Sequence, residues 1–252
     1  MRSVISLCIV LTVFGATTPP LDAQKRMPVL VELFTSEGCD TCPPAEKYLE
    51  RLLQEQPVAG VEIIALAEHV DYWNRLGWTD PFSSPLFSQR QKDYASFFKH
   101  DSVYTPQIIV NGTRELRAKD GVKTIEEAAQ DPTGSIKIRI ESAVENAVSL
   151  NLKITKLPAT SSGDRAIVTL AVVEDGLISN VLRGENSGRK LTHMAVVRSL
   201  RSIGESSGEE TILSANLTIE KNWKRDDLSV VAFVQEAQSR RVLASARIEL
   251  KH

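Results

Sequence analysis

VLVELFTSEGCDTCPPAEKYLERL, residues 29–52, is the stretch from which we infer the start of the fold. Its first third is a short apolar run rich in β-branched residues, which is typical of a buried strand. Two cysteines, Cys39 and Cys42, follow in a polar turn. Apolar side chains then recur at helical spacing, and the prolines after Cys42 suit a first helical turn, where a missing N–H costs little. The stretch therefore predicts a strand, a cysteine turn and a helix.

A second apolar run, VEIIALA at residues 61–67, follows breaks at Pro57 and Gly60. Strand, helix and strand at this spacing indicate a βαβ unit with a parallel strand pair. The pattern then predicts a helix carrying Leu86 to Phe98, a strand at Gln107–Val110 with an Asn111-Gly112 turn after it, and a short helix around Lys123–Gln130. We therefore expect an α/β domain over residues 27–131.

The hydrophobic pattern changes after about Ser135, where apolar and polar residues alternate with period two, as in half-buried antiparallel strands. The strands that this pattern predicts are residues 136–141, 148–155, Ala166–Glu174, His193–Ile203, Glu210–Glu220, Leu228–Glu236 and Arg241–Leu250. Roughly seven strands with polar turns favour an all-β antiparallel sandwich over residues 135–252, with an immunoglobulin-like arrangement as one option.

The N-terminus has the order of a secretory signal peptide: a charged Met1-Arg2, an apolar run over residues 4–16, and small and polar residues ending near Ala23. The apolar run is shorter than the ~20 residues that span a bilayer. We expect residues 1–23 to be removed, leaving a secreted or periplasmic protein without a stable membrane span. Its only cysteines, Cys39 and Cys42, can then pair with each other or transiently with a partner's thiol.

The charge balance excludes one class of partner. Lys and Arg number 30 and Asp and Glu number 32, a net charge of −2, and hydrophobic residues make up 42% of the chain. Such a composition supports a globular core but provides no basic surface for nucleic acid, so we expect no nucleic-acid partner.

The cysteine pair has what a disulfide-exchange centre needs: an attacking thiolate, a resolving thiol and access for a partner. At the start of a helix Cys39 would face solvent and Cys42 would point inward, and the helix N-terminus would favour a thiolate. Asp40 between the cysteines and Glu37 nearby act against it, because like charge disfavours the thiolate. We therefore expect a reductant or mild isomerase rather than a strong oxidant.

Thr105-Pro106 stands directly before a predicted strand. A cis proline here would lie against the disulfide, and the backbone of Thr105 would pair with an extended substrate segment. A trans proline that merely opens a strand is the alternative.

The segment from Val29 to Ala129 resembles the thioredoxin-like superfamily. More narrowly, VELFTSEGCDTCPPAE, HVDYWNRLGWTDPFSSPLFSQRQKDY, SVYTPQIIVNG and GENSGRKLTH resemble the secreted bacterial family called domain of unknown function 1223. The resemblance implies export and a thioredoxin-like fold for the first domain. It also implies that Cys39 is the nucleophile, Cys42 the resolving cysteine and Pro106 a cis proline.

Two other interpretations of the cysteines remain open. Cys39, Cys42, His69 and a second histidine would make a zinc set, but no second C-x-x-C or H-x3–5-H supports it, and His193 falls in the predicted β-domain. A purely structural disulfide is the other, although a two-residue loop constrains little chain entropy. We expect no metal and no organic cofactor.

His69 and Asp71, at the end of the second predicted strand, are a candidate auxiliary acid–base pair near the cysteine turn, unless His69 only anchors the loop. The aromatic side chains of this region either line a groove or belong to the core, and we expect core for all four: Trp73, Trp78, Phe82 and Phe87.

The sequence as a whole predicts an exported thiol–disulfide oxidoreductase that acts on protein or peptide thiols and disulfides with an unidentified electron donor. The alternative is a non-catalytic secreted binding module with a structural disulfide.

Overall fold

The computed structural model describes residues 26–117 and 120–251, and strands outweigh helices in these ranges. The predicted signal peptide lies outside the described residues. The strands are β1 (Met27–Thr35), β2 (Val61–His69), β3 (Gln107–Val110), β4 (Arg114–Glu115), β5 (Ser135–Val144), β6 (Ala147–Thr155), β7 (Ala166–Glu174), β8 (Leu177–Asn180), β9 (Lys190–His193), β10 (Val196–Ser206), β11 (Glu210–Thr218), β12 (Leu228–Glu236) and β13 (Val242–Glu249). The helices are α1 (Cys42–Glu55), α2 (Pro85–Phe98) and α3 (Gly121–Ala128), with short 3-10 turns η1 (Asn74–Leu76) and η2 (Arg225–Asp227).

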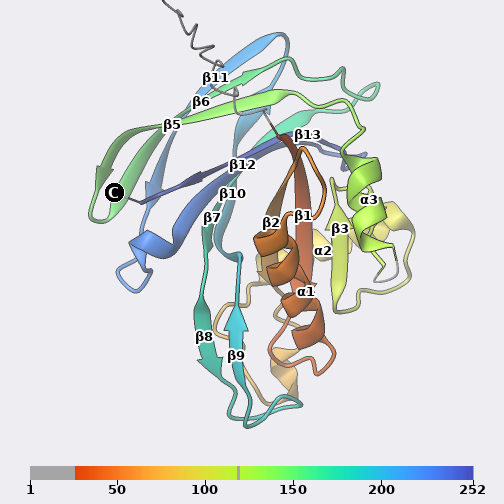
Figure 1. The fold of residues 1–252 in the computed structure, drawn as a ribbon, viewed down its shortest axis with the longest axis vertical. Helices are drawn as coiled ribbons and strands as arrows, with labels where there is room; N and C mark the ends of the chain where they lie inside the picture. The colour runs from red at the N-terminus through yellow and green to blue at the C-terminus, as the bar shows by residue number, and fades with distance from the viewer. Residues whose placement is uncertain (1–25, 118–119, 252) are drawn as a thin grey trace, which may run out of the picture.

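One mixed sheet runs through both halves of the chain, in the order β13-β12-β7-β10-β2-β1-β3-β4 (Figure 1). Strands β1 and β2 are parallel, as predicted, and β3 is antiparallel to β1. Strand β10 then joins the other edge of β2: Val196 lies opposite Ala67, and the Ala67 N–H donates to the Ala195 carbonyl at 2.7 Å. The large sheet therefore includes strands that the sequence assigned to a separate sandwich.

This continuous sheet corrects the predicted fold class. An α/β thioredoxin-like domain followed by an all-β sandwich is wrong: the protein is mostly β, with a large mixed eight-stranded sheet. The physical reason is that β2 leaves an open strand edge. Strand β10 pairs with this edge through backbone hydrogen bonds, and the pattern of side chains does not predict that pairing. Predicted strands were nevertheless well placed, since β3, β7 and β12 match their expected bounds.

Two hydrophobic clusters hold the layers together. The first packs α1 and the parallel strands with residues of the second half of the chain, among them Leu49, Ile64, Val197 and Phe233. The second lies between the large sheet and a three-stranded sheet of order β11-β6-β5. Burying one such leucine or phenylalanine side chain contributes about 1.5–3 kcal/mol. A core drawn from both halves explains why the sheet does not divide at residue 131.

Helices α1 and α2 lie on opposite faces of β1 and β2, α1 in front and α2 behind (Figure 1). The two strands are therefore covered on both sides, which accounts for their continuous apolar runs. Pro43 and Pro44 occupy the first turn of α1, as expected. No helix in the described ranges is both long and apolar enough to cross a membrane.

The hairpin of β8 and β9 was not predicted as such. Its two strands pair from Leu177 opposite His193 to Asn180 opposite Lys190. It leaves the large sheet before β10 and reaches the end of the molecule where α1 begins (Figure 1). This placement brings residues 182–193 to the cysteine turn.

Candidate functional site

Cys39 and Cys42 form a disulfide at the N-terminus of α1, with their Cα atoms 5.4 Å apart. Cys42 is the first residue of the helix, and the turn is closed by a hydrogen bond from the Cys42 N–H to the Cys39 carbonyl at 3.3 Å. The pair thus lies between the end of strand β1 and the first residue of helix α1, as the sequence indicated.

The expectation that Cys39 faces solvent is wrong, because both cysteines have 0% of their surface exposed. The loop between β8 and β9 contacts the backbone of the cysteine turn. The Asn186 side chain, itself fully buried, donates from Nδ2 to the carbonyl oxygens of Glu37 and Cys39, each at 2.8 Å. The Asp40 N–H donates to Glu185 in the same loop at 3.2 Å. The loop therefore clamps the cysteine turn.

Thr105 and Pro106 lie beside the disulfide, and the peptide bond between them is cis. The Thr105 carbonyl oxygen is 3.8 Å from the Cys39 sulfur, and the Thr41 hydroxyl is 3.3 Å from the same sulfur. Trp73 donates from Nε1 to the Thr105 hydroxyl at 2.8 Å, which anchors the segment. The structure thus brings together the four residues predicted to be catalytic or substrate-binding.

A cavity of about 520 Å³ borders this arrangement. Thr41 of the cysteine turn and Pro106 line it, together with Tyr48, Arg51 and Leu116. Its wall is largely apolar with one cation, a composition that suits a peptide side chain. The disulfide therefore has a neighbouring recess even though its sulfurs are covered.

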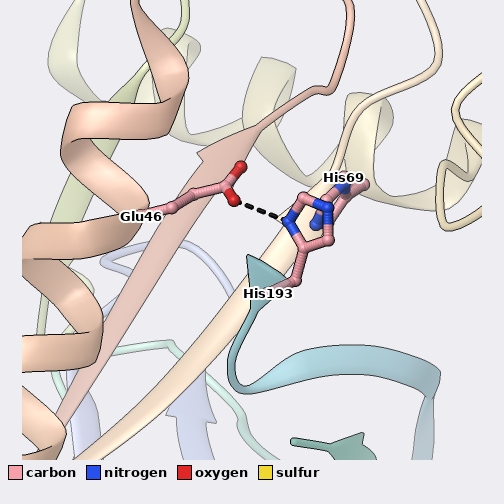
Figure 2. A group of neighbouring side chains, drawn as sticks. All are labelled: Glu46, His69 and His193. Atoms are coloured by element: carbon pink, nitrogen blue, oxygen red, sulfur yellow. Dashed lines mark hydrogen bonds and ion pairs between the residues drawn. The ribbon is translucent and has the colours of Figure 1, made fainter. Parts of the chain in front are cut away.

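Next to the cysteine turn lies a buried set of charged residues, Glu37, Glu46, His69, Asp80 and His193, which we call the His–carboxylate cluster. His193 Nδ1 is 2.6 Å from Glu46 Oε2, and its Nε2 is 3.0 Å from Glu37 Oε1. His69 Nδ1 is 2.7 Å from Asp80 Oδ2, which also accepts the Glu37 N–H at 2.8 Å. The two imidazole rings lie 5.1 Å apart (Figure 2).

Further donors satisfy the remaining carboxylate oxygens of the cluster. Trp78 donates from Nε1 to Glu37 Oε2 at 2.7 Å, and the Thr35 hydroxyl donates to Glu46 Oε1 at 2.6 Å. The ring of Phe82 packs edge-on against both histidines. Of the aromatic side chains considered, Phe87 belongs to the core, whereas Trp73, Trp78 and Phe82 surround the site.

Charge pairing in the cluster shifts its pKa values. Burial lowers the pKa of His193, but hydrogen bonds to Glu37 and Glu46 outweigh burial and raise it to about 10. Burial raises the pKa of Asp80, yet the adjacent His69 holds it below its ordinary value. The pKa of Glu46 is lowered in the same way, by His193 against burial. The carboxylates of Glu46 and Asp80 are therefore ionised and the His193 ring is charged at neutral pH.

The predicted pairing of His69 with Asp71 differs from what the structure places together. His69 contacts Asp80, eleven residues further along, while Asp71 Oδ1 accepts a hydrogen bond from the Ser88 hydroxyl. Asp71 thus holds α2 to the loop.

Sequence reasoning missed Glu46, Asp80, Asn186 and His193 as site residues. Two signals pointed to some of them. Glu46 stands four residues after Cys42, on the same helical face, and GENSGRKLTH contains both Asn186 and His193.

One comparison with known proteins shows a family. The model of the family described as "Protein of unknown function (DUF1223)" matches residues 30–235. No functionally curated protein matches the sequence. A crystal structure of protein AGR_C_4864 from Agrobacterium tumefaciens is 22% identical with a TM-score of 0.72, over 91% of this chain and 97% of that one. The structure of HBP35 of Porphyromonas gingivalis is 14% identical with a TM-score of 0.63, over 89% and 75%. At these identities the likeness shows the fold alone.

Proposed function

The chain belongs to the DUF1223 family of proteins of unknown function, and we propose that it is an exported thiol–disulfide oxidoreductase acting on protein or peptide thiols through Cys39 and Cys42. The carrying observation is the position of the disulfide. It opens helix α1 and lies against Thr105-Pro106, beside a recess that both Thr41 and Pro106 line. The residue-level resemblance to thioredoxin-like motifs supports the chemistry, although the fold differs.

The reaction needs a substrate sulfur to reach one cysteine of the pair. In the reducing direction, the Cys39 thiolate attacks a substrate disulfide, one substrate thiolate leaves, and Cys42 then displaces the second while the Cys39–Cys42 bond forms. A donor thiol outside this chain returns the pair to the reduced state. The recess beside Thr41 and Pro106 would hold the residue next to the substrate's sulfur.

Local charge supports a reductase or isomerase rather than an oxidase. Asp40 is exposed between the two cysteines, and Glu37 stands two residues before Cys39. His193 and Trp78 compensate Glu37, so the net influence on the thiols comes from Asp40. We expect a reduction potential nearer to the ~ −270 mV of thioredoxin than to the ~ −120 mV of a strong oxidant.

Trapping tests the proposal. The Cys42→Ser variant should accumulate mixed disulfides through Cys39 when mixed with oxidised exported proteins, whereas Cys39→Ser should not. Insulin reduction by the wild-type protein with a small thiol donor provides a rate. If neither variant traps a partner, and the reduction potential of the pair lies below about −300 mV, where structural disulfides fall, the binding-module alternative holds instead.

A further inference from the structure

Three residues of the His–carboxylate cluster come from elements far apart in the chain, yet their ligand atoms lie close together. Glu46 is on α1, His69 ends β2 and His193 ends β9. One ligand atom from each lies within 4.8 Å of those of the other two (Figure 2). The histidines are 0% and 1% exposed, so this is an interior site.

The orientation of both rings is fixed from outside the trio by carboxylates. Asp80 accepts from His69 Nδ1 at 2.7 Å, and Glu37 faces His193 Nε2 at 3.0 Å. The second nitrogen of each ring, Nε2 of His69 and Nδ1 of His193, therefore does not face these two carboxylates. A carboxylate on the far nitrogen of each imidazole is the outer-shell arrangement that orients metal-binding histidines.

The nitrogen Nε2 of His69 has no hydrogen-bond partner within the described ranges, although it is fully buried. Buried polar atoms are rarely left without a partner. The ion pairs of His193 with Glu46 and Glu37 explain why that ring is buried, but they leave the second nitrogen of His69 unexplained. A ligand that accepts a lone pair from His69 would give this nitrogen a partner.

We propose that Glu46, His69 and His193 bind a divalent transition-metal ion of the zinc class. Two imidazole nitrogens and one carboxylate oxygen are a donor set that such ions take, with a fourth position open. On binding, the ion replaces the proton that His193 Nδ1 shares with Glu46, and this proton leaves to solvent. This inference does not depend on the proposed function.

Charge and distance are both compatible with the exchange. Three carboxylates, on Glu37, Glu46 and Asp80, face two imidazole rings, so a dication in place of one proton reduces the excess of negative charge. Ligand atoms about 2.1 Å from zinc lie roughly 3–4 Å from one another. The Glu46–His193 pair, now at 2.6 Å, must widen and His69 must move closer, by side-chain shifts of about an ångström.

Zinc titration of the oxidised protein tests the site, because the intact disulfide keeps both cysteines out of the coordination shell. Isothermal calorimetry of metal-free protein with Zn²⁺ should give one site per chain. His69→Gln, which replaces the ring whose second nitrogen is unpartnered, should weaken binding at least tenfold, and Glu46→Gln similarly. His100→Gln removes a histidine from a surface pair with Glu115 (3.1 Å) and should leave the affinity unchanged.

Co²⁺ provides a readout that does not depend on variants folding. Binding at the trio should produce the visible absorption of a low-symmetry nitrogen–oxygen site in the wild-type protein, without a thiolate charge-transfer band. No stoichiometric Zn²⁺ uptake would overturn the proposal. So would uptake that a folded His69→Gln variant retains, or a Co²⁺ spectrum of the hydrated ion only.

Discussion

Asn186 reaches across the fold to donate from its side chain to the carbonyl oxygen of Cys39 at 2.8 Å, joining residues 147 positions apart. The same amide group binds the Glu37 carbonyl. A loop from the second half of the chain thus holds the backbone of the cysteine turn in place, and disulfide exchange requires access to that turn.

Removing this clamp should expose the disulfide. In Asn186→Ala both hydrogen bonds to the cysteine turn are lost, and we expect reduction of the disulfide by dithiothreitol to become several-fold faster, since opening the loop no longer breaks them. Thiol titration against time measures the rate. Ser187→Ala, in the same loop, removes only a hydrogen bond to the Leu182 carbonyl and should leave the rate near wild type. Equal rates in all three proteins would contradict this role of Asn186.

Removing the imidazole of the buried cluster should destabilise the fold. His193→Gln leaves Glu37 and Glu46 buried without their shared cation, and losing one partner of a buried charged set costs about 3–5 kcal/mol. Urea unfolding at pH 7 measures the change in free energy of unfolding. The matched control is His100→Gln, whose partly exposed pair with Glu115 should contribute under about 1 kcal/mol. Similar losses in both variants would argue against a special role for the cluster.

Acid should remove the contribution of Glu236 to the free energy of unfolding. Burial raises the pKa of its carboxyl, but hydrogen bonds from Arg241, Ser239 and the Ser161 N–H lower it to about 2, against 4.5 ordinarily. The depressed pKa stabilises the folded state above pH 4.5, and the contribution is lost as pH falls toward 2. It amounts to about 3 kcal/mol at neutral pH.

The comparison of wild type with Glu236→Gln isolates this effect. The difference in free energy of unfolding should shrink markedly between pH 7 and pH 3, as followed by urea titration at each pH. Glu249→Gln, which breaks an exposed pair with Lys251, should show a difference below about 1 kcal/mol throughout. A difference for Glu236→Gln that stays constant with pH would contradict the assignment.

Gly112 should tolerate no side chain, because it lies where the β3–β4 turn meets the β12–β13 turn. Its φ is +75°, and a Cβ built on it would overlap the Arg240 carbonyl oxygen. Gly163 has the same φ but open space around it. Thermal unfolding should show Gly163→Ala losing about 1 kcal/mol for the left-handed backbone alone, and Gly112→Ala losing clearly more. Equal losses would mean that the two turns separate readily.

Local patterns in the sequence determined most elements and the cysteine motif. The bounds of β3, β7 and β12, the helix after Cys42 and the position of Thr105-Pro106 follow from periodicity, proline and turn chemistry, which act between near neighbours in the chain. The proximity of Thr105 to Cys39 was also predicted, because a proline directly before a strand was expected to lie against the disulfide.

Tertiary structure alone decided the sheet and the composition of the site. The join of β10 to β2 is made of backbone hydrogen bonds, which any side chains permit, so two domains were predicted where one sheet exists. His193 was assigned to another domain, and Asp80 took the place of Asp71 beside His69, because a loop's path cannot be read from spacing. Contacts between residues more than a hundred positions apart depend on the energy of the whole fold. One of them holds the turn in which Cys39 is buried, whereas local rules predicted that Cys39 faces solvent.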